Sequence, residues 1–217
     1  MIRLVIFDLD GTAVDTLESL AYTVNRVMKR LGLREMPVEN FKYYAGDGAR
    51  KMIKRCLKDA GDITASHLDE ALDIYCEEFK KGCTYHVKPF PGLTETLEDL
   101  REYGVQLAIC TNKAQMYAES VIKKVYGKNM FDYILGEGSG YPRKPEPDGA
   151  LHIAEHLGVT PEECLYVGDT NTDMKTGLAA EMYTVGVTWG FRTREELEAF
   201  HPHRVIDRPQ ELLDIQM

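Results

Sequence analysis

The feature that most constrains the fold is a change of hydrophobic pattern along the chain. Residues 2–7 form a short apolar, β-rich run, which is typical of a strand buried on both faces of a parallel sheet. Residues 15–83 then follow helical spacing, as at Val24 and Val27. From about Tyr85 onward, strand-like and helix-like segments alternate. Alternation of this kind is typical of βαβ units in a doubly wound parallel sheet.

The alternating part contains five further predicted strands, at 105–110, 132–135, 164–167, 183–187 and 204–206, and the predicted helices between them include 114–126, 148–157 and 172–180. Strand 2–7 needs these strands as partners, so the helical stretch is an insert in their domain. A chain of 217 residues suits one domain with a sizeable insert. We predict an α/β core domain at 1–14 and 84–217, with a doubly wound, Rossmann-like parallel sheet, and an all-helical cap domain at 15–83.

Composition excludes some classes of partner. The chain carries 26 Lys and Arg against 35 Asp and Glu, a net charge of −9, which argues against a general nucleic-acid binder. No stretch approaches the roughly 20 apolar residues that span a bilayer. The five cysteines are odd in number and share no C-x-x-C spacing, and the opening apolar run is too short for a secretory signal. We therefore expect a cytoplasmic protein with no membrane partner.

Polar residues gather where the predicted strands end. They are Asp8, Asp10, Gly11 and Thr12 after the first strand, Thr111, Asn112 and Lys113 after the second, Arg143 and Lys144 before the helix at 148–157, and Gly168, Asp169 and Asp173 after the strand at 164–167. Ligands of doubly wound sheets bind outside the carboxyl ends of the strands. We therefore expect these side chains to meet at one edge of the sheet.

The chemistry of this set indicates a metal ion and a phosphate group. Residues i and i+2 of a strand face the same way, so Asp8 and Asp10 are expected to project together. Crowded carboxylates repel one another unless a cation lies among them, and Mg²⁺ takes carboxylate, water and phosphate oxygens. A nearby lysine suits an anionic substrate. Taken alone, however, Asp173 could simply cap the helix that it opens.

The four motifs, in this order, resemble those of the haloacid dehalogenase-like phosphatases, and the insert resembles that family's type 1 helical cap. The resemblance implies that Asp8 is the nucleophile, which takes the phosphoryl group as an aspartyl-phosphate. It implies that Asp10 is the general acid and then the general base. Thr111 and the Asn112 backbone would bind phosphoryl oxygens, and Lys144 would neutralise the nucleophile and the transferring group.

The resemblance also implies a Mg²⁺ site. The Asp8 and Asp169 carboxylates and the Asp10 backbone carbonyl would be the protein ligands. Asp173 would orient Lys144 or a water bound to the metal. An aspartate at position 10 favours a phosphatase or a phosphomutase over a dehalogenase, because an alkoxide leaving group needs a proton and a halide does not.

The cap loop at 44–50 resembles the Gly-x-Gly cap loop of phosphoglycolate phosphatases. We predict that its residues Gly46, Asp47, Gly48 and Arg50 contact substrate. Lys42, Lys51 and Lys54 are further candidates for a substrate carboxylate, although a solvated basic face explains these cations equally well. Arg143, beside Lys144 in a glycine-rich loop, could also reach substrate.

The leading hypothesis is a Mg²⁺-dependent phosphatase for a small phosphorylated metabolite, with 2-phosphoglycolate as the best single substrate. Pyrophosphate, nucleotide phosphates, sugar phosphates and a β-phosphoglucomutase-like reaction remain alternatives. A phospho-receiver signalling domain is a remote one, because its acceptor ends a middle strand and it carries no helical insert. The sequence does not distinguish a monomer from a homodimer.

Overall fold

The computed structural model describes residues 1–215 and contains two compact units. The core unit comprises residues 1–15 and the chain from Lys88 onward, and the helical unit comprises Thr16–Val87. The sequence-based boundaries at 15 and 83 thus differ from these by one and four residues. Within the described residues 1–215, no helix combines the length and the apolar character needed to cross a membrane.

The core unit is built on a six-stranded parallel sheet with the strand order β3-β2-β1-β4-β5-β6. The strands are β1 (Leu4–Phe7), β2 (Gln106–Ala114), β3 (Tyr133–Glu137), β4 (Cys164–Gly168), β5 (Tyr183–Val187) and β6 (Arg204–Ile206). The first strand in sequence therefore lies in the middle of the sheet, and the order reverses beside it. This confirms the predicted α/β, doubly wound fold.

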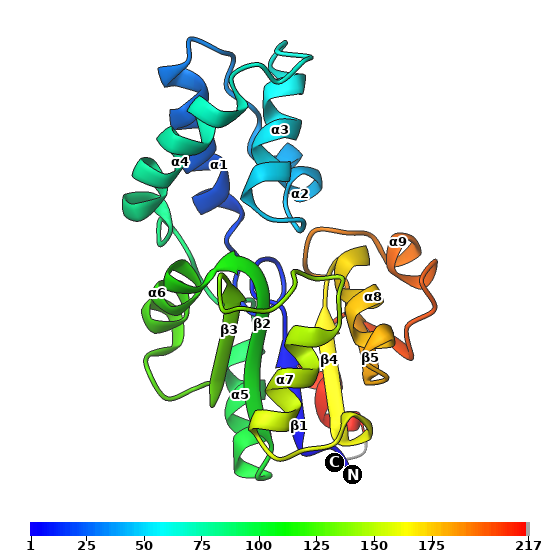
Figure 1. Cartoon of the computed structure of the whole chain (residues 1–217). Helices are drawn as coiled ribbons and strands as arrows, with labels where there is room; N and C mark the ends of the chain where they lie inside the picture. The colour runs from blue at the N-terminus through cyan, green and yellow to red at the C-terminus, as the bar shows by residue number, and fades with distance from the viewer. Residues whose placement is uncertain (216–217) are drawn as a thin grey trace. The chain divides into compact units, whose positions relative to one another are not determined.

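Helices cover both faces of this sheet. They are α5 (Leu93–Glu102), α6 (Gln115–Tyr126), α7 (Asp148–His156), α8 (Asn171–Ala179) and the short α9 (Arg194–Glu198). In Figure 1, α7 lies in front of the sheet and α5 behind it. Because both faces are covered, all four residues of β1 are buried, which explains its continuous apolar run.

The strand register fixes one face of the core. Ile6 lies opposite both Ala108 and Tyr166, and all three side chains are fully buried. Ala150 and Ile153 of α7 belong to the same hydrophobic cluster. This packing holds the carboxyl ends of β1, β2 and β4 side by side. The first, second and fourth polar motifs lie at these ends.

Strand β2 differs from its prediction. Residues 111–113 were expected to follow the strand, but β2 continues to Ala114. Its pairing with β3 shifts register between Cys110 and Ala114, and Ala114 then pairs with Glu137. The irregular segment keeps pairing after the shift, so the second motif lies within the strand rather than in a loop beyond it.

The helical unit contains α1 (Leu17–Arg30), α2 (Phe41–Tyr44), α3 (Ala49–Asp59) and α4 (Leu68–Gly82). Helices α1 and α4 bury their apolar faces, including Val24, Val27 and Phe79. The Ser19 hydroxyl of α1 donates to the Gly82 carbonyl at 2.8 Å, which joins the start of α1 to the end of α4.

Candidate active site

The loop after β1 is shaped by a close approach to Asp169. Gly11 has φ +89°, and a Cβ atom there would overlap the Asp169 carboxylate. A side chain is therefore excluded both by backbone conformation and by space. The loop is closed by the Gly11 N–H, which donates to the Val14 carbonyl at 2.9 Å. The backbone of this loop is therefore fixed, and it holds the polar side chains of the loop in place.

Lys144 lies at the centre of the site. Its ammonium donates to Asp8 Oδ1 at 2.6 Å and to Asp173 Oδ1 at 2.7 Å, and its side chain is 4% exposed. The Asn112 side chain positions the Lys144 backbone through a reciprocal pair of hydrogen bonds: Asn112 Nδ2 donates to the Lys144 carbonyl at 3.1 Å, and the Lys144 N–H donates to Asn112 Oδ1 at 2.9 Å. The second and third motifs thus hold each other.

The two aspartates that follow β4 are held by different donors. Asp169 is fully buried and accepts from the Thr12 hydroxyl and from the Phe191 N–H, both at 2.7 Å. Asp173 accepts at Oδ2 from the Thr170 N–H at 3.1 Å and from the Thr170 hydroxyl at 2.6 Å. Asp173 therefore caps α8 with one oxygen and binds Lys144 with the other, so both interpretations of this residue describe its contacts.

Burial and crowding perturb the charges of the site. Burial raises the pKa of the Asp8 carboxyl to about 7; Lys144 opposes this shift and Asp173 adds to it. Burial, Asp173 and Asp8 together raise the pKa of Asp169 well above its ordinary value. Burial alone would lower the pKa of Lys144, but Asp173 and Asp8 raise it well above the usual range. Three buried carboxyl groups thus share one ammonium, and their joint ionisation is favourable only if a further cation lies among them.

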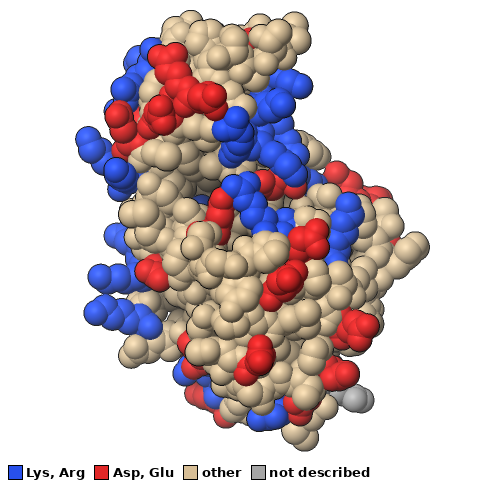
Figure 2. Space-filling view, viewed as in Figure 1, with Lys and Arg blue, Asp and Glu red and all other residues tan. Residues whose placement is uncertain are grey.

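The three crowded carboxyl groups are arranged as a hard divalent cation requires. Oxygens of Asp8, Asp169 and Asp173 lie within 4.8 Å of one another, and all three residues are buried. A cation bound there would neutralise the cluster and polarise the oxygens of a bound phosphate. This cluster is local: on the face shown in Figure 2, acidic and basic side chains are interspersed.

Asp10 has a different partner from Asp8. The Lys113 ammonium donates to both carboxylate oxygens of Asp10, at 2.6 and 2.9 Å. Through this ammonium the second motif contacts the loop after β1. The Lys113 backbone N–H donates to the Thr111 hydroxyl, within the motif, at 3.2 Å. Lys113 was expected at this edge of the sheet with Thr111 and Asn112, but no catalytic or binding role was predicted for it.

The predicted residues of the core unit form a polar network of three hydrogen-bonded groups, which are Asp8, Asp173, Lys144 and Asn112; Asp169 and Thr12; and Asp10, Lys113 and Thr111. The first two groups adjoin, because oxygens of Asp8, Asp169 and Asp173 lie within 4.8 Å of one another. The Lys144–Pro145 peptide bond is cis. Arg143 lies next to this network in sequence but pairs with Glu137, and its side chain is 46% exposed.

The predicted cap-loop residues lie in the helical unit: Gly46, Asp47 and Gly48 between α2 and α3, and Arg50 in the first turn of α3. Gly46 and Gly48 have φ values of +109° and +85°, so this turn requires glycine at both positions. Asp47 pairs with Arg55, and Arg50, 56% exposed, pairs with Asp69 at 3.1 Å. The contact of these residues with substrate stays a prediction.

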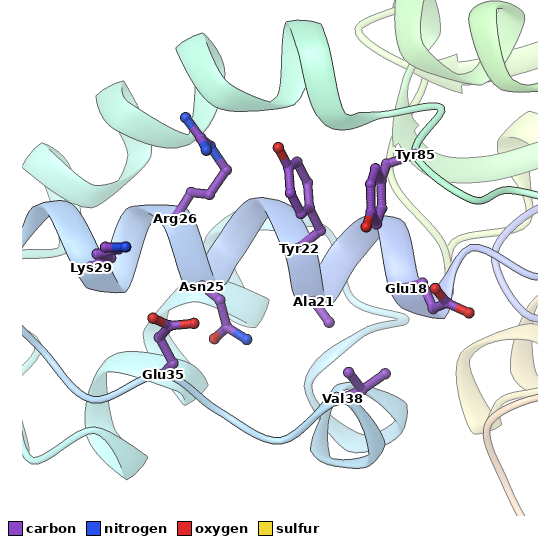
Figure 3. Close-up of a pocket in the computed structure, with 9 residues that line it drawn as sticks. All are labelled: Glu18, Ala21, Tyr22, Asn25, Arg26, Lys29, Glu35, Val38 and Tyr85. Atoms are coloured by element: carbon purple, nitrogen blue, oxygen red, sulfur yellow. The ribbon is translucent and has the colours of Figure 1, made fainter.

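The helical unit also has an open pocket of about 380 Å³. Figure 3 shows its lining side chains, which come from α1, from the segment that follows it and from Tyr85. The rings of Tyr22 and Tyr85 stack with their centroids 4.1 Å apart, and the Arg26 guanidinium lies 5.6 Å from the centre of the Tyr22 ring. The predicted cap-loop residues are not part of its lining.

Comparison with known proteins assigns the chain to a family. The family model described as "Haloacid dehalogenase-like hydrolase" matches residues 5–187. The chain belongs to the haloacid dehalogenase-like hydrolases. This assignment confirms both the predicted family and the prediction of an enzyme.

Individual members of the haloacid dehalogenase-like hydrolases resemble the chain over nearly its whole length. A phosphoglycolate phosphatase from Pseudomonas putida is 34% identical over 97% of this chain and 78% of its own. A phosphoglycolate phosphatase from Aquifex aeolicus is 30% identical over 98% of this chain and 96% of its own. The solved structure of a haloacid dehalogenase-like family hydrolase from Streptococcus pneumoniae superposes with a TM-score of 0.87 at 25% identity, covering 98% of this chain and 97% of that one.

Proposed function

We propose that the protein is a Mg²⁺-dependent phosphatase that hydrolyses 2-phosphoglycolate through an aspartyl-phosphate intermediate. The observation that carries the proposal is the buried Lys144 ammonium, bonded at once to Asp8 and Asp173 beside the Asp169 carboxylate. A nucleophilic carboxylate, a cation for the phosphoryl group and a cluster suited to a metal lie together. Phosphoryl transfer needs chiefly this positioning and charge neutralisation.

In the first step a carboxylate oxygen of Asp8 attacks phosphorus. The bond between phosphorus and the ester oxygen breaks, and its electron pair goes to that oxygen. Asp10 donates the proton that makes glycolate a neutral alcohol at this position. Thr111 and the Asn112 backbone bind phosphoryl oxygens, and Lys144 offsets the charge that Asp8 and the phosphoryl group share.

In the second step water attacks the phosphorus of the aspartyl-phosphate. Asp10, now a carboxylate, takes a proton from this water. The bond between phosphorus and the Asp8 oxygen breaks, and its electron pair restores the Asp8 carboxylate. Inorganic phosphate leaves, and the enzyme returns to its first state.

Asp8, Asp169 and the Asp10 carbonyl would hold Mg²⁺, with Asp173 orienting Lys144 or a bound water. The cation supplies charge neutralisation to the phosphoryl group and to the crowded carboxylates. Asp169 is prepared for this role by its two fixed donors, Thr12 and the Phe191 N–H. Donors of this kind orient a metal ligand.

The choice of substrate rests on the relatives, two of which carry the name phosphoglycolate phosphatase. A small phosphorylated acid in the cytoplasm also suits a chain of net charge −9 better than nucleic acid does. We assign substrate contacts in the cap to Gly46, Asp47, Gly48 and Arg50. Substitution of Gly46 is then expected to lower kcat/KM for 2-phosphoglycolate more than that for p-nitrophenyl phosphate.

The test is phosphate release with Mg²⁺ from 2-phosphoglycolate, pyrophosphate, a nucleoside monophosphate and a hexose phosphate. The highest kcat/KM is expected for 2-phosphoglycolate. Asp8→Asn should abolish release, whereas the matched control Asp207→Asn, an exposed aspartate bonded to Arg194, should retain it. Isomerised hexose phosphate with little free phosphate would indicate a mutase instead, and one phosphorylation without turnover would indicate a receiver domain.

A further inference from the structure

The ion pair between Lys113 and Asp10 is more enclosed than ordinary surface pairs. The Lys113 side chain is 4% exposed and that of Asp10 is 17% exposed. Taking an ammonium out of water costs several kcal/mol unless its partner is well placed. Here both carboxylate oxygens accept from the ammonium, at 2.6 and 2.9 Å. The lysine is therefore fixed beside Asp10, and Asp10 is the more accessible partner.

The backbone of Lys113 is also fixed. A Cβ atom at Gly136 would lie 2.6 Å from the Lys113 carbonyl, so β3 approaches this residue more closely than a side chain permits. On its other side the Lys113 N–H donates to the Thr111 hydroxyl. A cation anchored in this way presents its charge at a defined point, which is a property of binding sites.

The inference rests on the proposed function, in which Asp10 protonates the ester oxygen of 2-phosphoglycolate, so the Lys113 ammonium beside Asp10 lies close to that ester bond. A general acid must lie within about 2.6–3.2 Å of the oxygen that it protonates. In 2-phosphoglycolate a single carbon separates that ester oxygen from the carboxylate. A carboxylate this close to the ester oxygen therefore lies beside Lys113, the partner of Asp10. Lys144 is committed to Asp8 and Asp173, on the nucleophile's side.

We propose that Lys113 determines specificity by binding the carboxylate of the leaving alcohol, and that this second acceptor releases one Asp10 oxygen to face the ester oxygen. The carboxylate of the substrate then contributes twice: it binds to the enzyme and it completes the acid's position. When the leaving alcohol is neutral, Lys113 stays bonded to both carboxylate oxygens of Asp10. The preference therefore affects kcat as well as KM, as expected when binding assembles the reacting groups.

Arg143 is the competing cation. It belongs to the segment between β3 and α7 that carries Lys144, and its guanidinium is a second possible donor to the same carboxylate. Its guanidinium pairs with Glu137 and its side chain is 46% exposed, so its charge is screened by solvent. A purely structural Lys113 is the other alternative, in which case its loss affects every substrate alike.

The experiment compares 2-phosphoglycolate with 2-phosphoglycolamide, which replaces the carboxylate by a neutral amide of nearly the same shape. Initial rates of phosphate release give kcat/KM for both, with wild-type protein, Lys113→Met, Lys113→Arg and Arg143→Met. Wild-type protein should prefer the carboxylate. In Lys113→Met the ratio of the two kcat/KM values should fall about 10- to 100-fold, the range expected for a hydrogen bond to a charged group. Lys113→Arg should recover most of the ratio, and Arg143→Met should preserve it.

Three results would overturn the inference. Wild-type protein that hydrolyses both compounds equally well removes it without any variant, which covers the case in which Lys113→Met does not fold. An unchanged ratio in Lys113→Met makes Lys113 a structural anchor, and a ratio lost only in Arg143→Met transfers the role to that residue. In each of these cases 2-phosphoglycolate is still hydrolysed, so the proposed function stands. Absence of phosphate release from both compounds and from p-nitrophenyl phosphate instead removes the proposed function itself.

Discussion

The hydroxyl of Thr12 offers a direct measure of how the acidic cluster is held. It donates to Asp169 Oδ1 at 2.7 Å, and both residues are fully buried. Thr12→Val replaces the hydroxyl by a methyl group of the same shape. The substitution opens no cavity, and it leaves one oxygen of a buried carboxylate without this donor. The Phe191 N–H still donates to the other oxygen.

The magnitude follows from the kind of bond that is lost. A hydrogen bond to a charged group contributes about 1.5–3 kcal/mol, whereas one between neutral groups contributes about 0.5–1.5 kcal/mol. We therefore expect Thr12→Val to lower the free energy of unfolding of the core unit by about 2 kcal/mol without Mg²⁺. Loss of a partner that orients a metal ligand typically weakens metal affinity or activity about 10- to 100-fold. The Mg²⁺ concentration for half-maximal phosphate release should rise by a similar factor.

The assay is urea unfolding followed by the fluorescence of Trp189, the single tryptophan of the chain. Its indole N–H donates to the Thr12 carbonyl at 3.1 Å, so it reports on the core unit close to the substitution. Thr12→Ser keeps the hydroxyl and should stay near wild-type. Thr176→Val is the matched control: its buried hydroxyl donates to the Thr172 carbonyl at 2.9 Å, within α8, and its loss should cost less than about 1 kcal/mol. If Thr12→Val matches Thr176→Val in stability and wild-type in Mg²⁺ requirement, Thr12 does not support Asp169.

The remaining predictions concern the metal and two positions of the sheet. Adding Mg²⁺ to EDTA-treated protein should restore phosphate release. It should also raise the free energy of unfolding, by about 2.7 kcal/mol when the Mg²⁺ concentration is one hundred times the dissociation constant of the Mg²⁺ complex. An unfolding transition that calorimetry finds unchanged by Mg²⁺ would contradict a cation at Asp8, Asp169 and Asp173. Gly168→Ala should destabilise the core unit by about 1–3 kcal/mol or more, because its Cβ would overlap that of Asp173, whereas Gly186→Ala, at the paired position of β5, meets its nearest atom at 3.3 Å and should cost less in urea unfolding. Tyr166→Phe should leave stability unchanged or raise it by about 1 kcal/mol, because the buried hydroxyl has no hydrogen-bond partner among the described residues; a loss above 1 kcal/mol in the same assay would show that the hydroxyl is satisfied.

Much of the fold could be predicted because its signals are local. The apolar run that becomes β1 has no polar face, and this pattern survives only between two covered faces of a sheet. The short α2 at 41–44 has too few residues to show helical periodicity, and the sequence did not single it out. The extension of β2 to Ala114 depends on pairing with Glu137 after a register shift, which no pattern within β2 records.

The candidate site was predictable to the extent that strand ends converge. Asp8 and Asp169 directly follow two strands of one parallel sheet, Thr111 lies in the last part of a third, and the sheet order brings those ends together. Their spacing in sequence could not indicate which cation each carboxylate takes. Their i, i+2 spacing predicted that Asp8 and Asp10 project to the same side, whereas in the structure they bind different lysines, Lys144 and Lys113.

By itself, the sequence determined the class of the fold, the helical insert and the set of residues at the sheet edge. Hydrophobic periodicity and the polar motifs are local patterns, so they can be recognised from residues that are close together in the chain. The tertiary structure alone decided how the charges pair. Lys144 and Asp8 are 136 positions apart, and Lys113 and Asp10 are 103 apart. An ion pair requires the two charged groups to lie within about 4 Å of each other, and its strength depends on burial; both are set only when the strands pack.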